Sequence, residues 1–586
     1  MTRSSLATSL QPKSSLVAAV FRLPALAAAL CLAGLGAVHA QAPGAGDVLR
    51  ETSRQQPQPP KADPGLPTAQ PVRPALQDRP GFKMVVNGFR ISGASAIPET
   101  DLQLLLVEQL GKENTFNDLQ TAVASVSNFY RAKGYFVARA YLPQQEIKGG
   151  IVEIAVLEGT VGANIVKQGG SARTKPGVLQ GFLSTNVPSG SVVHESKLER
   201  AALLANDLPG VNATIGLDPG ATTGTTDVSL EANEGKLLNV SVDLDNYGNR
   251  FTGQWRLGAN VTLNSPAGLG DQASLRLMQT DGDLDFLRLS YQLPIGSNGT
   301  RAGVAYSNVG FTVCCQGAFN PSGEGQILSL FVTHPIVRSR NYNLYFNGGW
   351  DDKTSINVPL AGTSRERNIG LLTLGLNMDR RDNLGGGGVV FGNVSLATGR
   401  LGIKDPVDAA ADAAGVRAAG GFTKVMAQIA RTQRLSDSFS LYGGLNAQWA
   451  NKNLDASEKF SLGGAQGVRA YPSGEAAGDE GYLAQLELRA DLPFSPAGTQ
   501  WQAFMFTDLG STITNKTPAV AGIVPNNYRI GAYGLGLNIT RAGLFQVRTM
   551  WAHKMGSNPG ANPLNGNDGD GKQDRSRFWL QAVTQF

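Results

Sequence analysis

The chain has 586 residues, with 51 Lys and Arg against 46 Asp and Glu, 72 glycines and three cysteines. This length exceeds that of an ordinary single domain, so several domains are expected. Three cations of the first 40 residues account for most of the net positive charge, and the rest of the chain is close to neutral. Such a balance excludes a nucleic-acid-binding class that depends on a basic surface.

Residues 1–40 have the layout of a secretory signal peptide. Three cations and no acid accompany an apolar run at residues 23–36, and the small residues near Ala40 fit cleavage after that position. No run of about 18 apolar residues follows, so no membrane helix is expected. An exported, glycine-rich chain without such a helix can still cross a membrane as a β-barrel.

The mature chain keeps two cysteines, Cys314 and Cys315, which are adjacent. Consecutive Cα atoms lie about 3.8 Å apart, closer than the ~4.4–6.8 Å that is usual across a disulfide. A bond between them would be strained, and the sequence leaves their redox state open.

Residues 41–80 are not expected to pack a core. Residues 47–54 are compatible with two helical turns, whereas residues 55–80 are rich in proline and glutamine and are typical of a linker. From propensity alone, a disordered N-terminus is the favoured interpretation of residues 47–54.

Residues 81–160 are predicted to form a small α+β domain with the element order β-α-α-β-β. Asn117, with Gln120 three residues later, indicates a capping box at the start of the second helix. One buried stripe along that helix has the spacing i, i+4, i+7, i+11: Leu119, Val123, Val126 and Tyr130. The predicted elements are a strand at 82–91, a helix at 98–110, the helix from 117, and strands at 136–142 and Ile151–Leu157.

Residues 161–235 repeat this order more loosely. Helices are predicted near 176–183 and 196–208, and strands near 211–217 and 227–232. Two α+β domains in tandem are therefore expected.

From residue 236 to residue 586 the hydrophobic pattern changes to a period of two. For example, Leu287, Leu289 and Tyr291 alternate with Arg288 and Ser290. In a soluble sandwich the apolar faces would meet in a core, whereas in an outer-membrane barrel they face lipid and the polar faces line a watery lumen. About sixteen strands of ~9–11 residues fit this length.

Connection lengths and the C-terminus favour the barrel. Short connections at 265–270, 296–300, 338–341, 383–386 and 541–543 interleave with long ones at 313–323, 404–419, 462–479 and 556–574, although the connection near Asp281 is short where a long one is expected. The last strand places Phe578, Leu580 and Phe586 on one face and ends on an interfacial aromatic, a candidate assembly signal. The predicted fold class is membrane all-β: an antiparallel transmembrane barrel of about sixteen strands preceded by two α+β domains.

Several fragments, in this order, carry a family resemblance. They are Tyr130-Arg-Ala-Lys-Gly-Tyr135, Leu142-Pro-Gln-Gln145, Glu158-Gly159, Asn206-Asp-Leu-Pro-Gly-Val211 and Asp245-Asn-Tyr-Gly-Asn-Arg250. Together they resemble the outer-membrane transporters of two-partner secretion, the TpsB proteins of ShlB/FhaC type, with ShlB-type POTRA domains ahead of the barrel. The resemblance covers essentially the whole mature chain.

The resemblance implies an internal loop after the eleventh strand, held by one charge pair. By position, Arg469 at the tip formed by Val468, Ala470 and Tyr471 is expected to pair with Asp508, which follows Phe506. Ala470 stands where the family usually has glycine, which questions the tip conformation if a positive φ is needed. A lumen pair in water is worth roughly 0–1 kcal/mol, so we expect a positional latch. Residues 47–54 are then expected to resemble the family's plug helix.

The resemblance implies export of a secreted TpsA-type exoprotein from a Gram-negative periplasm, with the two POTRA domains on the periplasmic side. Capture by strand addition is expected at a sheet edge, either the strand with Ile151 and Leu157 or the strand with Val211 and Leu217. The sequence leaves the partner's identity and its activation during export open. Other expected partners are outer-membrane lipid and the barrel-assembly machinery, without nucleic acid.

Three other function classes compete with export. A barrel-assembly factor is the alternative, although such proteins commonly carry more POTRA domains. A passive diffusion channel would not explain the tandem domains. Enzymatic activity is not expected, and neither is a cofactor or metal, because the mature histidines are widely spaced and no nucleophile or metal-ligand motif occurs.

Overall fold

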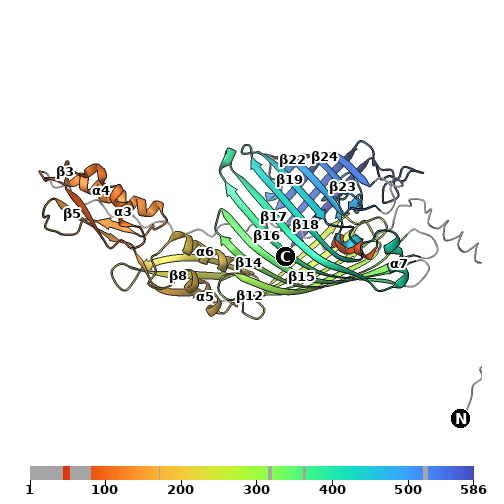
Figure 1. Cartoon of the computed structure of the whole chain (residues 1–586), viewed down its shortest axis with the longest axis horizontal. Coiled ribbons are helices and arrows are strands. Elements are labelled where there is room, and N and C mark those ends of the chain that lie inside the picture. The colour runs from red at the N-terminus through yellow and green to blue at the C-terminus, as the bar shows by residue number, and fades with distance from the viewer. Residues whose placement is uncertain (1–43, 53–80, 171, 315–319, 360–363, 519–525) are drawn as a thin grey trace, which may run out of the picture.

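The computed structural model describes residues 44–52, 81–170, 172–314, 320–359, 364–518 and 526–586. The predicted signal peptide, the predicted linker and Cys315 lie outside these residues. Two small domains lead in single file to a large barrel, and a short helix lies inside the barrel (Figure 1). None of the described helices is both long and apolar enough to cross a bilayer.

The first domain is built from a short pair of strands, a three-stranded sheet and helices packed against it. Its elements are β1 (Lys83–Val85), β2 (Gly88–Ser92), α3 (Glu99–Leu104), η1 (Val107–Gln109), β3 (Glu113–Thr115), α4 (Phe116–Ala132), β4 (Arg139–Tyr141) and β5 (Ile151–Leu157). The single strand predicted at 82–91 is two strands, because β1 pairs with β3 whereas β2 pairs with β5.

The N-terminus of α4 differs from its prediction. Thr115 is the N-cap, and its hydroxyl accepts from the N–H of Asp118, whose carboxylate accepts from the N–H of Thr115. A Thr/Asp pair satisfies the free donors of the first turn two residues before the predicted Asn117/Gln120 box. The predicted stripe does face the core, with Leu119, Val126 and Tyr130 buried and Val123 partly buried.

The second domain repeats the plan with longer strands. Its elements are β6 (Thr160–Gln168), α5 (Pro176–Asn186), α6 (Glu195–Asn206), β7 (Val211–Pro219) and β8 (Thr225–Glu234), and the sheet order is β6-β8-β7. Leucines of both helices, with Phe182 of α5 and the alanines of α6, fill the core against β7 and β8.

The sheet orders correct one predicted capture strand. β5 lies between β2 and β4, so Ile151 and Leu157 belong to a central strand. The part of β5 that β4 does not reach is covered by the amide of Gln145, which donates to the carbonyl of Glu153 (2.8 Å) and accepts from its N–H (2.7 Å). In the described residues β7 pairs with β8 alone, so Val211 and Leu217 lie on an edge strand.

Sixteen antiparallel strands close the barrel, which confirms the predicted fold class. In chain order they are β9 (Leu238–Asp245), β10 (Arg256–Asn264), β11 (Gln272–Thr280), β12 (Asp283–Ile295), β13 (Thr300–Thr312), β14 (Ser322–Arg338), β15 (Tyr342–Val358), β16 (Arg365–Asp382), β17 (Gly388–Ile403), β18 (Gly420–Arg434), β19 (Phe439–Ala450), β22 (Glu480–Asp491), β23 (Gln500–Ile513), β24 (Asn527–Arg541), β25 (Phe545–Met555) and β26 (Ser576–Gln585).

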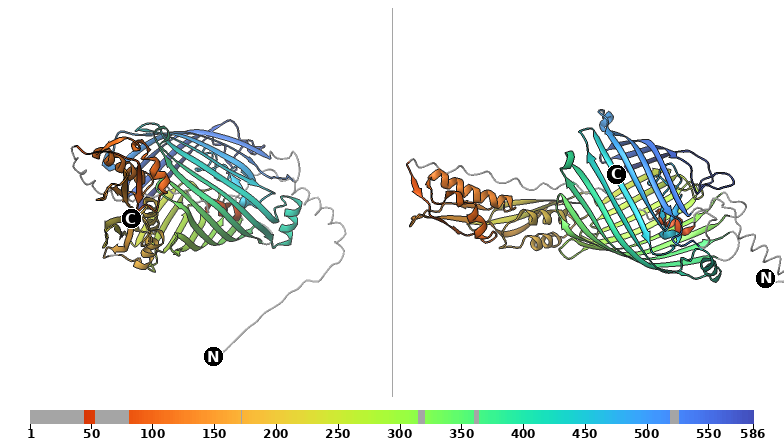
Figure 2. Two further views of the ribbon diagram at one scale, coloured as in Figure 1. Left: turned by 60° about the vertical axis from the view of Figure 1, so that its left-hand side comes forward. Right: turned by 45° about the horizontal axis from the view of Figure 1, so that its top comes forward.

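The barrel exposes an apolar belt on its outer face. Outward residues such as Leu257, Leu289, Leu486 and Met505 stay exposed among neighbouring strands, as expected for a surface that meets lipid. Strands tilt around the wall in both views of Figure 2. The long connections and α7 (Pro406–Ala414) gather at the end of the barrel that lies away from the two domains (Figure 1).

The second domain docks on the short turns at the other end. Asp207, at the C-terminus of α6, accepts two hydrogen bonds from Arg338 (2.9 Å each), and its carbonyl accepts from Arg301 (3.0 Å). Arg200 donates to the carbonyl of Pro335 (3.0 Å). This interface places the exit of the second domain at the mouth of the barrel.

Candidate functional site

A cavity of about 1660 Å³ runs inside the barrel. At one end it is lined by Asp207 and Pro209 of the second domain, and at the other by Arg50 and Thr52 of the short helix. The loop that follows β19 contributes residues 463–466 to the same lining. One continuous space therefore connects the periplasmic domain to the underside of two internal obstructions, the helix and the loop.

The helix α2 (Ala45–Thr52) is held in the lumen by its apolar side. Val48 and Leu49 are buried in a cluster with Phe286, Val309 and Phe311 of the barrel wall. Leu49 lies against Gly325, where an added Cβ would come within 2.5 Å of the leucine Cγ. An amphipathic segment this short is not stable as a helix in water, so packing against the wall orders it.

Polar contacts fix the two ends of α2, which lies two residues upstream of the predicted 47–54. The N–H of Ala45 donates to the side-chain oxygen of Asn357 on β15 (2.8 Å). Arg50 donates to the carbonyl of Ala456 and pairs with Asp47 (2.9 Å). Ala456 belongs to η3 (Ala456–Glu458), so the helix rests on the loop as well as on the wall.

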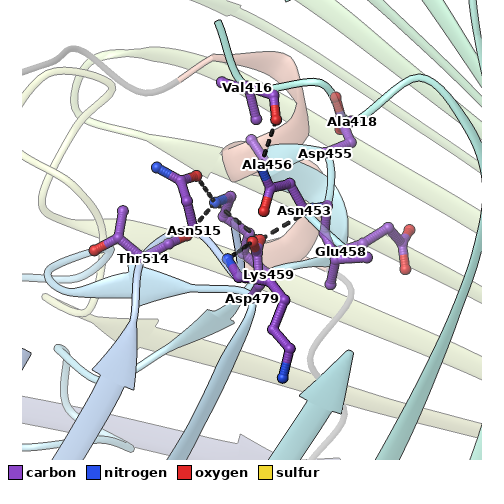
Figure 3. Close-up of polar contacts among 12 residues, drawn as sticks. Val416, Ala418, Asn453, Asp455, Ala456, Glu458, Lys459, Asp479, Thr514 and Asn515 are labelled. Atoms are coloured by element: carbon purple, nitrogen blue, oxygen red, sulfur yellow. Dashed lines mark hydrogen bonds and ion pairs between the residues drawn. The ribbon is translucent and has the colours of Figure 1, made fainter. Parts of the chain in front are cut away.

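The loop at 451–479 is anchored at its base by a buried carboxylate (Figure 3). Asp479 forms an ion pair with Lys459 (2.9 Å) and accepts hydrogen bonds from the N–H groups of Leu454 (3.0 Å) and Lys516 (2.8 Å). Asn453 donates to the carbonyl of Val416 in the neighbouring long connection. Two outer connections are thereby tied to the base of the loop.

A second buried carboxylate holds η3 to the wall. Glu458 forms ion pairs with Lys353 of β15 (2.7 Å) and Lys424 of β18 (2.9 Å). Burial opposes its ionisation, but the two lysines outweigh it and lower the pKa of Glu458 to about 2. The loop segment under α2 is therefore fixed by full charges across two separate strands.

The tip of the loop brings Arg469 and Asp508 together. The guanidinium donates to Asp508 through Nε (2.8 Å) and Nη2 (2.6 Å), and the backbone N–H of Arg469 donates to the same carboxylate (3.1 Å). Phe506 lies under the guanidinium, 3.5 Å from its ring centroid. This is a bidentate pair with a cation–π contact, a geometry that only arginine supplies.

The environment of this pair contradicts the expected energy of 0–1 kcal/mol. Arg469 is 1% exposed and Asp508 is 0% exposed, within a cluster of packed apolar residues. Screening by water is therefore absent, and removal of one partner from a buried pair typically costs about 3–5 kcal/mol. Since both side chains are buried, the ion pair holds the loop tip strongly in this position.

Sequence reasoning missed the second partner of Arg469. Glu487 on β22 accepts from Arg469 Nη1 (2.6 Å) and also from Arg489 (2.6 Å) and Arg548 (3.1 Å). Trp579 donates from Nε1 to the carbonyl of Arg469 (2.6 Å). The alternation along β22 puts Glu487 on the lumen face, but only its register beside β23 brings it to the loop tip.

Ala470 fits the tip without strain. It is not among the described non-glycine residues with positive φ, namely Ser265, Arg417, Ala476 and Ala497. Val468, Ala470 and Tyr471 are fully buried, and Lys554 lies over the Tyr471 ring, 5.0 Å from its centroid. Burial raises the pKa of the Tyr471 hydroxyl to about 12. The glycine that the resemblance led us to expect is not required by this backbone.

The other predicted residues lie away from the lumen. Phe578 and Phe586 are exposed on the outer face, with Leu580 between them, and Phe586 donates its N–H to Val240 at the seam between β26 and β9. Cys314 follows β13, and its N–H donates to the carbonyl of Phe251 in the connection between β9 and β10. No group of three or more potential metal ligands occurs in the part of the chain that is described.

Comparison with known proteins gives one consistent result. Residues 224–538 match the family of haemolysin secretion/activation proteins ShlB/FhaC/HecB, and residues 84–159 match the ShlB-type POTRA domain. The heme/hemopexin transporter protein HuxB of Haemophilus influenzae is 30% identical over 83% of this chain and 84% of its own length. The outer membrane transporter CdiB of Dickeya dadantii is 23% identical over 72% of this chain and 73% of its own. CdiB from Escherichia coli has the same fold, with a TM-score of 0.69 at 20% identity over 89% of this chain and 94% of that one.

Proposed function

The chain belongs to the ShlB/FhaC/HecB family of secretion proteins. On that premise we propose that it exports one specific partner protein, which passes through the lumen of this barrel. It is an outer-membrane transporter of two-partner secretion that exports a secreted exoprotein, and not an enzyme. The observation that carries the route is the cavity that extends from Asp207 at the periplasmic mouth to Arg50 of the luminal helix α2.

The first step of the proposed route is capture by the periplasmic domains. β7 offers an unpaired edge among the described residues, and an unfolded chain can add a strand there through backbone hydrogen bonds. The docking of Asp207 on Arg338 keeps this domain at the barrel mouth. A captured segment would therefore be presented directly to the cavity.

The second step is removal of two obstructions. We assign α2 as the plug and the Arg469 loop as the latch. Arg50 of α2 rests on Ala456 of that loop, which supports a linked release of both. Because the fixation of Arg469 is buried and strong, we expect opening to need the binding energy of the partner.

Deletion of residues 82–234 tests the proposal. We expect the partner to disappear from the medium while the barrel still folds and inserts, because only the capture domains are lost. The matched control is Arg400→Gln, a loss of one exposed charge on the outer face. Secretion that persists after the deletion, with barrel levels unchanged, would contradict capture by these domains.

The partner can be identified from the medium of a strain without the transporter. We expect one large secreted protein to be lost, whereas depletion of many membrane barrels would favour an assembly factor instead. Because HuxB is more similar to this chain than CdiB, an exoprotein linked to heme or hemopexin is the first candidate. Outer-membrane lipid and the assembly machinery complete the proposed partners, since the belt and the aromatic C-terminus are the surfaces that both would meet.

A further inference from the structure

Two arginines face each other on the cavity wall. Arg276 of β11 and Arg288 of β12 are direct cross-strand neighbours, and both line the cavity. Like charges placed opposite each other on a sheet destabilise it. A local rule that is broken without structural benefit points to a functional position.

Arg276 is neutralised by a carboxylate two strands away. Its guanidinium crosses β10 to Asp243 on β9 and donates to it through both terminal nitrogens, with 2.8 Å for Nη2. Gly258 makes this crossing possible, because a Cβ at that position would lie 2.4 Å from Nη2 of Arg276. The guanidinium of Arg276 therefore points away from Arg288, and its charge is compensated by Asp243.

Arg288 has no such partner. It donates from Nη1 to the hydroxyl of Ser307 (2.9 Å), and no carboxylate of the described residues lies within 4.0 Å of it. Asp351 on β15 acts on it through charge alone, while its own carboxylate accepts from Ser329 (2.6 Å). A guanidinium carries five N–H donors, so most donors of Arg288 remain available to the cavity.

The position of Arg288 is just below the plug. Phe286, two residues nearer the outer end of β12, packs in the cluster that holds Leu49 of α2. Ser290, two residues nearer the periplasmic turn, lines the open cavity. A chain that enters beside Asp207 would therefore reach Arg288 before it displaces α2.

We propose that Arg288 is a binding site for a carboxylate of the exported polypeptide, an acidic side chain or the C-terminal carboxylate, held beneath the plug. This inference rests on the proposed route through the lumen and adds a binding site along that route. A guanidinium binds a carboxylate through two parallel hydrogen bonds. Arg276 cannot supply this contact, because Asp243 already occupies it.

The test uses the full-length protein in a planar lipid bilayer, with peptide added on the side of the POTRA domains. We expect hexaglutamate to interrupt the current for longer than hexaglutamine. Arg288→Gln should shorten the hexaglutamate interruptions about tenfold, the effect of losing a charge-assisted hydrogen bond. Arg400→Gln, which removes an outward charge of the same sign, should leave them unchanged.

Two further measurements keep the outcome decisive. Arg288→Lys retains the charge without the fork and should give an intermediate effect, and resistance to unfolding in detergent should match the unaltered protein for each variant. The site would be overturned if hexaglutamate and hexaglutamine interrupted the current of the unaltered protein for equal times. It would also be overturned if hexaglutamate interrupted the current of Arg288→Gln for as long as that of the unaltered protein. Neither result would contradict export itself. Failure of the unaltered protein to secrete any partner would instead refute the proposed function.

Discussion

Replacement of Arg469 by alanine is the most informative perturbation of the latch. It removes the cation that Asp508 and Glu487 share at the loop tip. Glu487 keeps Arg489 and Arg548 as partners, so it stays compensated. Asp508, which is 0% exposed, keeps two neutral donors, the backbone N–H of residue 469 at 3.1 Å and the side-chain amide of Gln485 at 3.4 Å, but no cation. The cost of the substitution therefore falls on one buried, uncompensated carboxylate.

The magnitude follows from that asymmetry. Loss of one partner from a buried pair typically costs about 3–5 kcal/mol, and each 1.4 kcal/mol changes an equilibrium tenfold. The seated position of the loop should therefore lose a factor of about one hundred to several thousand in population. The barrel itself should remain folded, because its wall is held by the strand ladders.

Single-channel recording measures this population directly. We expect Arg469→Ala to open for a much larger fraction of time than the unaltered protein, and partner secretion to fall because the loop no longer seats in register. Proteolysis of the loop from the outer side gives an independent readout.

The double variant Arg469→Ala, Asp508→Ala distinguishes charge from packing. It leaves no unpaired charge, so its loop should seat better than that of Arg469→Ala alone. If Arg469→Ala is open for the same fraction of time as the unaltered protein, the assignment of Arg469 as the latch is refuted. A double variant that is worse than the single one would refute the buried-charge argument.

Three further outcomes are expected from separate parts of the molecule. Gly325→Val should displace Leu49 and raise the basal conductance, because the added side chain occupies the space of the leucine. Asp207→Asn should weaken the grip of Arg338 and speed hydrogen exchange where the second domain meets the barrel, with a loss of about 1.5–3 kcal/mol. Burial opposes ionisation of Glu158, but hydrogen bonds from the first domain outweigh it and lower its pKa, so the stability it adds is present at neutral pH and lost as the pH falls through that lowered value. Glu158→Gln should remove this acid sensitivity in pulse proteolysis with urea, and an unchanged pH profile would contradict it.

The barrel was predictable because each strand carries its own signal. A period of two over residues such as Leu287 to Tyr291 fixes which face meets lipid without knowledge of any neighbour. The same holds for the stripe on α4, where Leu119 and Tyr130 are buried as expected. Periodicity is a local property, and burial follows it.

Edges and caps could not be predicted in the same way. Whether a strand is central or at an edge depends on its neighbours, so Ile151 and Leu157 were placed wrongly on an exposed edge. The cap of α4 moved to Thr115, since several nearby polar residues can each satisfy the first turn and only the fold selects one.

The sequence by itself determined the tandem domains, the strand periodicity and the chemical identity of the loop tip around Arg469. Only the tertiary structure decided that Arg469 and Asp508 are buried and that Glu487 is a second ion-pair partner of Arg469. It also decided that, among the described residues, Arg288 faces the cavity without a carboxylate partner. The physical reason is that burial and charge compensation are sums over neighbours from distant strands. Those neighbours are set by the register of the closed barrel, which no single segment of the chain encodes.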